Sequence, residues 1–547
     1  MHLKLLSLLL SGFSLVSCEN DEIIVELDNG AIRGTTMESV DGVEYFAFLG
    51  IPYTEPPLGE LRFKPPVPKK PWSKNGILDA TKDGAVCIQV DLISKSVIGN
   101  ENCLFVNVYT KQYLSEKKYP VMVWIHGGAF RFGHGSSWMY GPSRFIAEDV
   151  VLVSFNYRLN SLGFLATNDD ASPGNYGLLD QLEALKWVKA NIDAFGGDAN
   201  QVTLFGQSAG SVSTYYQMLS PLSEGLFHRV IALSGSPLCP WGFEDEPQYW
   251  AKKVGKALKC PTDHHELVDC LRKISAAEII KAAEPFTKDI MIPFPPVVDG
   301  KFITIDPRTS FEGGIMSKIP LMTGIVRDEG VGIYGLIHFK LQKYSEQLLN
   351  QNIRSAINDD RDIPSVIELI KQRYMQNCDV SSKLETAVAI SKFLGDAVFD
   401  VCGYEAVKHS LNAGVKTHVY NFDFAANYSI LNLLGIKEYL GVAHGDELWY
   451  LFDGKLFDNF MRNDRVKQMA VKFVKLLANF AKFGDATHDF DIKWPPSAPG
   501  NIKVYHIDEE SHVEEYDFKN DPRTEFWIKT VPRSIKNSAE QKQKTEL

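Results

Sequence analysis

Short apolar runs recur through the first half of the chain, and segments with helical spacing follow them. Four such runs occupy residues 121–125, 150–153, 202–205 and 230–233. Their length and β-branched content are typical of strands that are buried on both faces of a mainly parallel sheet. Between the second run and the third, apolar residues recur on one helix face at Leu182, Leu185, Val188 and Ile192. This alternation predicts a doubly wound α/β sheet.

The second half continues the pattern with two more strand candidates, at residues 319–322 and 418–422. Residues 466–480 then carry a helical stripe of apolar side chains with lysines elsewhere on the helix, and Gly484 is placed to end it. A basic amphipathic helix can lie on a membrane surface. We expect this one to pack on the sheet.

The two ends of the chain resemble targeting signals. Lys4 precedes the apolar run 5–16, and small residues follow, which is the form of a secretory signal peptide over residues 1–18. No later stretch is long and apolar enough for a transmembrane helix. We expect one domain over residues 19–547, with a charged tail from about residue 531. The final Lys-Thr-Glu-Leu (544–547) is similar to an ER-retrieval signal.

Composition narrows the class of protein further. The net charge of −11 repels a phosphate backbone, so nucleic-acid binding is not expected. The chain has eight cysteines, and Cys18 is removed with the signal peptide. The seven that remain are typical of a protein from an oxidising compartment, and their odd number leaves at least one thiol unpaired. The sequon at Asn427 is a candidate glycosylation site. The candidates for local disulfides, by spacing, are Cys87 with Cys103 and Cys260 with Cys270, while Cys239, Cys378 and Cys402 stay unassigned.

A G-x-S-x-G motif spans residues 206–210 and makes Ser208 a candidate nucleophile. The apolar run 202–205 leads directly into it, and a helix-compatible stretch follows, which is the strand–turn–helix setting that this motif requires. Glycines on both sides remove Cβ atoms where the chain turns tightly, so the serine can lie exposed at a helix N-terminus.

The Gly-rich segment His126-Gly127-Gly128-Ala129-Phe130 directly follows the strand at 121–125. Backbone N–H groups in such a loop can stabilise the negative charge of a tetrahedral intermediate, and the N–H after the nucleophile, on Ala209, completes this oxyanion hole. The loop lacks the Gly-Lys-Ser/Thr and G-x-G-x-x-G patterns of phosphate-binding loops.

A serine nucleophile needs a histidine base and an acid, in the chain order Ser, Asp/Glu, His. His444 lies in a Gly-punctuated segment, whereas His264 and His265 lie between two cysteines, where a solvated loop is expected. For the acid, the adjacent Asp328 and Glu329 are equal candidates. Spacing alone therefore leaves both partners open.

Several ordered segments resemble the type-B carboxylesterases, in the branch related to cholinesterases, over residues 22–530. The matching segments are Phe-Leu-Gly-Ile-Pro-Tyr at 48–53, Pro-Pro-Leu-Gly-Glu-Leu-Arg-Phe at 56–63, Glu-Asn-Cys-Leu-Phe-Val-Asn-Val-Tyr at 101–109, Asn-Tyr-Arg-Leu at 156–159, Gly-Phe-Leu at 163–165 and Gly-Asn-Tyr-Gly-Leu-Leu-Asp-Gln at 174–181. The resemblance implies an α/β-hydrolase fold and a carboxylic-ester hydrolase that needs neither metal nor organic cofactor.

The resemblance also assigns roles to residues. It implies Ser208 as nucleophile, Glu329 as the acid and His444 as the base. It places the oxyanion donors on Gly128, Ala129 and Ala209, a polar residue near the triad at Ser234 and an aromatic wall of the acyl pocket at Trp241. It also pairs Cys87 with Cys103 and Cys260 with Cys270.

Three departures from the family pattern bear on the substrate. Gln207 stands beside the nucleophile where cholinesterases have Glu, and residues 88–102 lack the Trp on which choline's ammonium group stacks. Both changes weaken recognition of a cationic ester, while G-Q-S-A-G also occurs in insect juvenile-hormone esterases. Ala129, where many relatives have Gly, adds a methyl group beside the oxyanion hole.

We therefore expect a two-step hydrolysis of apolar or xenobiotic small-molecule esters through an acyl-enzyme. A dedicated juvenile-hormone or odorant esterase is the alternative within the same chemistry. A non-catalytic adhesion relative, or a protein that sequesters esters by slow deacylation, is the alternative of another class. The sequence does not indicate an oligomeric state.

Overall fold

The computed structural model describes residues 22–39, 42–72, 76–288, 290–359, 363–426, 428–454 and 463–537. The expected signal peptide, the sequon asparagine Asn427 and the final tetrapeptide lie outside these ranges.

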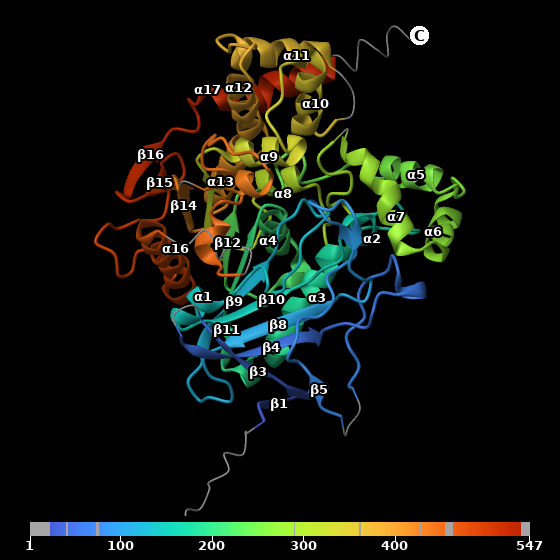
Figure 1. Ribbon diagram of the computed structural model, residues 1–547, viewed down its shortest axis with the longest axis vertical. Coiled ribbons are helices and arrows are strands. Elements are labelled where there is room, and N and C mark those ends of the chain that lie inside the picture. The colour runs from blue at the N-terminus through green and yellow to red at the C-terminus, as the bar shows by residue number, and fades with distance from the viewer. Residues whose placement is uncertain are drawn as a thin grey trace, which may run out of the picture.

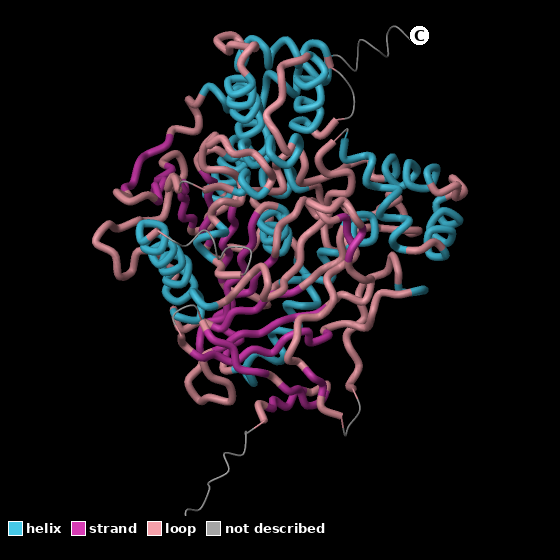
Figure 2. Tube along the Cα trace, in the orientation of Figure 1, coloured by secondary structure: helices cyan, strands magenta, loops and turns pink. Residues whose placement is uncertain are grey.

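A single large sheet runs through the centre of the molecule, with its strands drawn in magenta in Figure 2. Its strand order is β16-β15-β14-β13-β12-β11-β9-β10-β8-β4-β3. The strands are β3 (Thr35–Glu38), β4 (Glu44–Pro52), β8 (Phe105–Thr110), β9 (Tyr119–Ile125), β10 (Val151–Phe155), β11 (Gly197–Gln207), β12 (Arg229–Leu233), β13 (Leu321–Val326), β14 (Thr417–Phe422), β15 (Ile502–Ile507) and β16 (His512–Tyr516).

The strands from β10 to β15 in this order pair in parallel, and the pairs at the two ends of the sheet are antiparallel. All six runs that the sequence predicted as strands lie in this parallel part, so the α/β-hydrolase architecture is confirmed. The antiparallel edge strands β3 and β16 have exposed positions and lack the continuous apolar pattern, whereas β4 is mostly buried and apolar.

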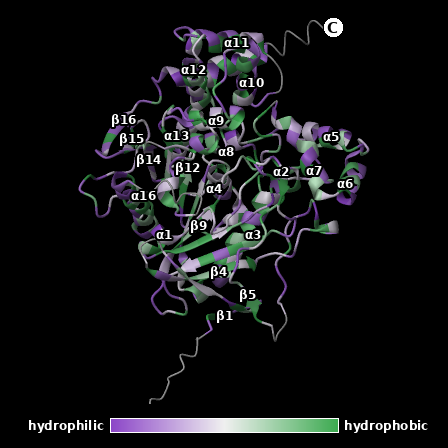
Figure 3. Cartoon of the chain, viewed as in Figure 1, coloured by the Kyte–Doolittle hydropathy of each residue, from purple (hydrophilic) through white to green (hydrophobic). Residues whose placement is uncertain are grey.

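Alternate side chains of the central strands enter two separate cores, because successive residues of a strand point to opposite faces. Val121, Val123 and Ile125 of β9 belong to the core on one face, whereas Met122 and Trp124 belong to the core on the other. Helices α3 (Tyr176–Asn191) and α4 (Ala209–Leu219) cover the first face, and α16 (Asp464–Phe483) covers the second. Figure 3 shows green apolar segments along the central strands.

Helix α16 confirms the predicted amphipathic helix, and Gly484 ends it in the left-handed conformation. Figure 1 shows α10, α11, α12 and α17 grouped at the end of the molecule opposite β1, and α5, α6 and α7 in a lobe at the side. The remaining helices are α1 (Ser143–Ala147), α2 (Asn160–Phe164), α5 (Gln248–Ala257), α6 (His264–Lys273), α7 (Ala276–Ala283), α8 (Pro307–Glu312), α9 (Glu329–His338), α10 (Glu346–Ile357), α11 (Pro364–Ile370), α12 (Lys383–Gly395), α13 (Val401–Asn412), α14 (Ile430–Leu433), α15 (Leu448–Leu451) and α17 (Pro522–Glu525).

Two small sheets flank the main one. The first orders its strands β1 (Ile24–Leu27), β2 (Gly30–Arg33) and β5 (Leu78–Asp79), and the second pairs β6 (Gln89–Val90) with β7 (Val97–Ile98). No helix in the described ranges is long and apolar enough to cross a membrane.

Three disulfides join Cys87 to Cys103, Cys260 to Cys270 and Cys239 to Cys402, and Cys378 is a free thiol. The expectation of a solvated loop around His264 and His265 is wrong, because these residues begin helix α6. The side chain of Asp263 caps this helix by accepting a hydrogen bond from the Glu266 N–H.

Candidate active site

The candidate site residues lie where parallel strands of the main sheet end. The carboxyl ends of parallel strands meet at one edge of a sheet, and ligands bind at that edge in open α/β folds. Ser208 directly follows β11, and the loop at 126–130 follows the neighbouring strand β9, with Gly206 and Ile125 in register. Glu329 follows β13, and a single β-bridge between Asp328 and Ala443 brings the His444 segment alongside.

Ser208 occupies a strained turn between β11 and α4. Its backbone angles are φ 58° and ψ −122°, a conformation that a side chain with Cβ rarely adopts. The flanking glycines permit this turn, because a Cβ at Gly210 would lie 2.1 Å from the Ile125 carbonyl oxygen. A Cβ at Gly206 would lie 2.6 Å from the Gly210 backbone. The two glycines of the motif therefore permit the close approach of backbone to backbone.

The loop after β9 turns sharply beside the serine. Gly128 has φ +112°, and a Cβ there would lie 1.9 Å from the Phe132 carbonyl oxygen. Ala129 follows with φ 56°. Among the loop and turn hydrogen bonds of the described residues, none is donated by the N–H groups of Gly128, Ala129 or Ala209. These three donors are the ones that the resemblance indicated.

His126 begins this loop but carries no charge there. Its ring is stacked on that of Tyr157 at a centroid distance of 4.4 Å, and its Nδ1 lies 2.8 Å from the Gly127 carbonyl oxygen. Burial lowers the pKa of His126 to about 3. The imidazole is therefore neutral near neutral pH and donates its Nδ1 proton to the loop it begins.

His444 and Glu329 form a buried pair. His444 Nδ1 lies 2.6 Å from Glu329 Oε2, and the two side chains are 7% and 0% exposed. The other oxygen, Oε1, accepts a hydrogen bond of 3.0 Å from the Val326 N–H. His444 Nε2 faces Gln207, whose side-chain nitrogen lies 3.2 Å away.

Asp328, the other candidate acid, has a different role in the structure. Its Oδ2 accepts a hydrogen bond of 2.8 Å from the Val442 N–H and pairs with Arg327 at 2.9 Å. Its side chain is 34% exposed. Asp328 therefore joins the His444 segment to the end of β13, whereas Glu329 contacts the imidazole itself.

Two further carboxylates lie in the segment after His444. Burial raises the pKa of Asp446 to about 6, although its carboxylate accepts hydrogen bonds from the Ile430 and Ala443 N–H groups at 2.7 and 2.9 Å. Glu447 is fully buried, and no hydrogen bond of ordinary geometry reaches its carboxylate from the described residues. Burial is the larger cause and the negative charge of Glu329 the smaller one, and together they raise the pKa of Glu447 well above its ordinary value. Both effects favour the protonated form of this carboxyl over the ionised form.

An aromatic side chain covers the candidate base. The Phe399 ring stacks on the His444 imidazole at a centroid distance of 4.2 Å and an interplanar angle of 27°. Trp241 packs against Phe399 at 5.6 Å, and its indole N–H donates a hydrogen bond of 2.8 Å to the Val398 carbonyl oxygen. Trp241 thus supports the aromatic residue that contacts His444.

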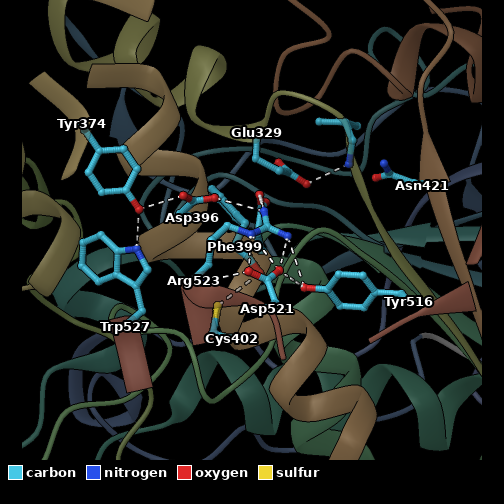
Figure 4. Close-up of polar contacts among 12 residues, drawn as sticks. Glu329, Tyr374, Asp396, Phe399, Cys402, Asn421, Tyr516, Asp521, Arg523 and Trp527 are labelled. Carbon is cyan, nitrogen blue, oxygen red and sulfur yellow. Dashed lines mark hydrogen bonds and ion pairs between the residues drawn. The ribbon is translucent and has the colours of Figure 1, made fainter. Parts of the chain in front are cut away.

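Phe399 lies in the π-helical turn η6 (Asp396–Asp400), which joins α12 to α13. Such turns are rare and occur frequently at functional sites. Figure 4 shows Arg523, from the C-terminal end of the chain, between the carboxylates that fix this turn. Its guanidinium lies 3.1 Å from Asp396, 3.3 Å from Asp400 and 2.7 Å from Asp521. The disulfide from Cys402 to Cys239 fixes the chain just after the turn.

Two further predicted positions are Ser234 and the segment 88–102. Ser234 follows β12 with φ 57° and is buried, and its N–H donates to the Gly324 carbonyl oxygen at 2.9 Å. Residues 88–102, which lack Trp, contain the short hairpin of β6 and β7. The sequence did not indicate Phe399 or the Cys239–Cys402 disulfide, because neither belongs to a local motif.

The strand order, with the strained serine turn and the buried carboxylate–imidazole pair at one edge of the sheet, places the chain in the α/β-hydrolase class. A profile described as the carboxylesterase family matches residues 21–527, and this chain belongs to that family. It is a carboxylic ester hydrolase.

Curated relatives cover nearly the same length. A carboxylic ester hydrolase of Bombus ignitus is 34% identical over 96% of this chain and 98% of its own. A juvenile hormone esterase of Tribolium castaneum is 35% identical over 87% of this chain and 86% of its own. A pyrethroid hydrolase of Rattus norvegicus is 31% identical over 95% and 92%.

Proposed function

We propose that Ser208, His444 and Glu329 are the catalytic triad of this ester hydrolase. Ser208 attacks the ester carbonyl while His444 accepts its proton at Nε2, and Glu329 holds the proton on Nδ1 and stabilises the imidazolium. The alcohol leaves with the proton from His444. Water then attacks the acyl-enzyme by the same route, which releases the acid and restores the serine.

The oxyanion of each tetrahedral intermediate is bound by the N–H groups of Gly128, Ala129 and Ala209. Preorganised donors of this kind contribute the largest single electrostatic effect in many hydrolases. Gln207, which contacts His444 Nε2 in the resting structure, has to yield that nitrogen to the Ser208 hydroxyl when the substrate binds.

The observation that carries this proposal is the 2.6 Å contact between His444 Nδ1 and the buried Glu329 carboxylate, at the sheet edge that also bears Ser208. The direct test replaces Ser208 by alanine. The Ser208→Ala variant should neither hydrolyse p-nitrophenyl acetate nor react with a fluorophosphonate probe. Labelling that persists in a folded Ser208→Ala protein would refute the assignment of the nucleophile.

We propose that the substrates are apolar or xenobiotic esters without a cationic group. The support is chemical: the residue beside the nucleophile is the neutral Gln207, and residues 88–102 offer no Trp for cation–π stacking. Measuring kcat/KM over esters of increasing acyl and alcohol length, with a choline ester and a juvenile hormone included, tests this. A choline ester that exceeds the apolar esters would contradict the proposal.

A juvenile-hormone esterase is the second candidate, favoured by Gln207 in its motif and by the Tribolium relative. In the ester panel it would show a kcat/KM for the hormone that far exceeds that for every simple ester. Sequestration is separable by kinetics, because it gives a burst equal to the enzyme concentration and then negligible turnover.

We further propose that the mature chain begins near Glu19 as one catalytic domain in the secretory pathway. The three disulfides support an oxidising compartment. Expression of the full chain with and without residues 544–547 separates the two destinations. Retrieval to the ER predicts that the truncated protein appears in the medium while the full chain stays in the cell.

A further inference from the structure

A group of metal-binding side chains lies at the outer edge of the main sheet, apart from the proposed triad. His506 of β15 is the cross-strand partner of His512 on the edge strand β16. Glu514 comes two residues after His512, so both side chains lie on one face of the strand. One imidazole pair and one carboxylate therefore converge on the same face of the β15–β16 hairpin.

The geometry of the group is that of a partly assembled chelate. The two imidazole rings are stacked at a centroid distance of 4.7 Å with an interplanar angle of 6°. His506 Nε2 lies 3.4 Å from Glu514 Oε2. One ligand atom from each of His506, His512 and Glu514 can be chosen so that all lie within 4.8 Å of one another.

The inner imidazole is held in one orientation by a fourth residue. Asp423, just after β14, lies 2.5 Å from His506 Nδ1, and Asn421 donates a hydrogen bond of 3.0 Å to the other oxygen of Asp423. Arg327 donates to the Asp423 carbonyl oxygen at 3.2 Å. A carboxylate that accepts the Nδ1 proton of a histidine directs the Nε2 lone pair outward, as in metal sites where the carboxylate orients the ligand.

The side-chain exposures divide the group into a fixed part and an adjustable part. Asp423 and His506 are 15% and 18% exposed, whereas Glu514 is 66% exposed. Tetrahedral Zn²⁺ with bonds of about 2.0–2.1 Å requires ligand atoms about 3.3 Å apart. The exposed side chains of His512 and Glu514 can rotate to close the remaining distance.

We propose that His506, His512 and Glu514 bind a divalent transition-metal cation, for which Zn²⁺ is the probe, and that Asp423 orients His506. Two imidazoles and a carboxylate are donors that Zn²⁺ accepts, and they disfavour Ca²⁺ and Mg²⁺, which prefer oxygen ligands. The cation joins β16 to β15 at the open edge of the sheet. Because only the folded hairpin presents the three ligands together, the cation stabilises the folded chain.

The site is separate from the catalytic proposal. β15 is four positions in the sheet from β11, which leads into Ser208, and two positions from β13, which leads into Glu329; these are about 19 Å and about 10 Å at the usual strand spacing of about 4.8 Å. Ester hydrolysis should therefore be the same with and without the cation. The metal site can fail while the triad proposal stands, and the reverse also holds.

The test uses the full chain after treatment with EDTA and removal of the chelator. Calorimetric titration with Zn²⁺ should give one equivalent bound per chain, with a rise in melting temperature, and Mg²⁺ should give neither. His512→Ala should abolish both effects, and Asp423→Asn should weaken the affinity about 10–100-fold, as removal of an orienting partner does. An anomalous-diffraction peak between His506 and His512 would locate the ion.

His265→Ala is the matched control, because His265 is an exposed histidine whose Nε2 lies 3.5 Å from an Asp170 carboxylate oxygen, and its loss should leave Zn²⁺ binding unchanged. If His512→Ala does not fold, Glu514→Gln takes its place with the same expected loss. Absence of saturable Zn²⁺ binding to the wild-type chain overturns the proposal. Binding that survives folded His512→Ala and Glu514→Gln variants overturns it equally, since the ion is then held elsewhere.

Discussion

Replacement of Glu329 by glutamine tests the proposed triad through the proton on the imidazole. In the native pair, Oε1 accepts the Val326 N–H at 3.0 Å and Oε2 contacts His444 Nδ1 at 2.6 Å. The Val326 N–H is buried and needs an acceptor, so the carbonyl oxygen of the glutamine is held at the position of Oε1. Its NH₂ group then faces Nδ1. The imidazole has to carry its proton on Nε2, the atom that must accept the serine proton.

The magnitude follows from this tautomer. In a serine protease triad whose carboxylate is replaced by its amide, the wrong tautomer lowers kcat about 10⁴-fold. At about 1.4 kcal/mol per factor of ten, this is about 5 kcal/mol of lost transition-state stabilisation. The shapes of Gln and Glu are nearly the same, so we expect the Glu329→Gln protein to fold and to bind substrate with a KM close to that of the wild type.

Asp328→Asn is the matched control, since the two carboxylates are adjacent in sequence. Asp328 contacts a backbone N–H and Arg327 but not the imidazole, and its side chain is 34% exposed. Partly exposed ion pairs contribute about 0–1 kcal/mol, so kcat/KM should fall by less than about fivefold.

The assay is the initial rate of p-nitrophenyl ester hydrolysis by both variants, with thermal melts to establish that each is folded. Active sites of the wild type are counted with a fluorophosphonate. If folded Glu329→Gln keeps more than a tenth of the wild-type kcat, or if Asp328→Asn loses more activity than Glu329→Gln, the assignment of the acid is refuted.

Three further perturbations address the surroundings of the site. Asp446→Asn removes a carboxyl whose pKa in the folded protein, about 6, exceeds its ordinary value of 3.8. The contribution of this carboxyl to stability is full below about pH 4 and is lost as the pH rises through 6. The free energy of unfolding of the wild type should therefore fall by about 3 kcal/mol relative to that of the variant between pH 4 and 7. Phe399→Leu removes the ring stacked on His444, and kcat should fall about two- to tenfold with little change in KM. Cys239→Ser with Cys402→Ser opens a disulfide of sequence separation 163 and should cost about 2–4 kcal/mol of stability.

Each of these three has a distinct contradicting outcome. Parallel pH–stability curves for wild type and Asp446→Asn, measured by urea unfolding, would mean that this carboxyl does not titrate differently in the folded state. A change confined to KM in Phe399→Leu would assign the ring to substrate binding instead of the base. For the disulfide, Cys378→Ser is the control because this thiol is free, and an equal drop in melting temperature would show a nonspecific effect of cysteine replacement.

The central strands and the serine turn were predictable because their causes are local. A strand buried on both faces is apolar at most positions, and a turn that brings Gly210 within reach of the Ile125 carbonyl oxygen must lack a side chain there. Each requirement restricts the residue types within a few consecutive positions. The same local pattern did not distinguish Asp328 from Glu329 as the candidate acid, because the two residues are adjacent.

The rest of the site depends on contacts between distant segments. Phe399 reaches His444 because a π-helical turn, Arg523 and the Cys239–Cys402 disulfide hold it there, and no short motif encodes these contacts. The edge strand β16 was not predicted, for another reason. Its outward-facing side chains are polar, so its sequence resembles that of a loop. Physical constraints spread over long sequence separations are the ones that a linear pattern does not reveal.

The charges around the candidate base explain why a neutral residue at position 207 matters. Three carboxyl groups, on Glu329, Asp446 and Glu447, lie in the segments that hold His444. Burial and the charge of Glu329 raise the pKa of Glu447, and Asp446 directs its oxygens at backbone N–H groups. Among the described residues, the carboxylate that contacts the imidazole is that of Glu329, on the Nδ1 side. A second carboxylate in place of Gln207 would add negative charge on the Nε2 side, beside the nucleophile, where a cationic alcohol group would gain from it. The absence of that charge at Gln207 supports our proposal that the substrates are uncharged esters.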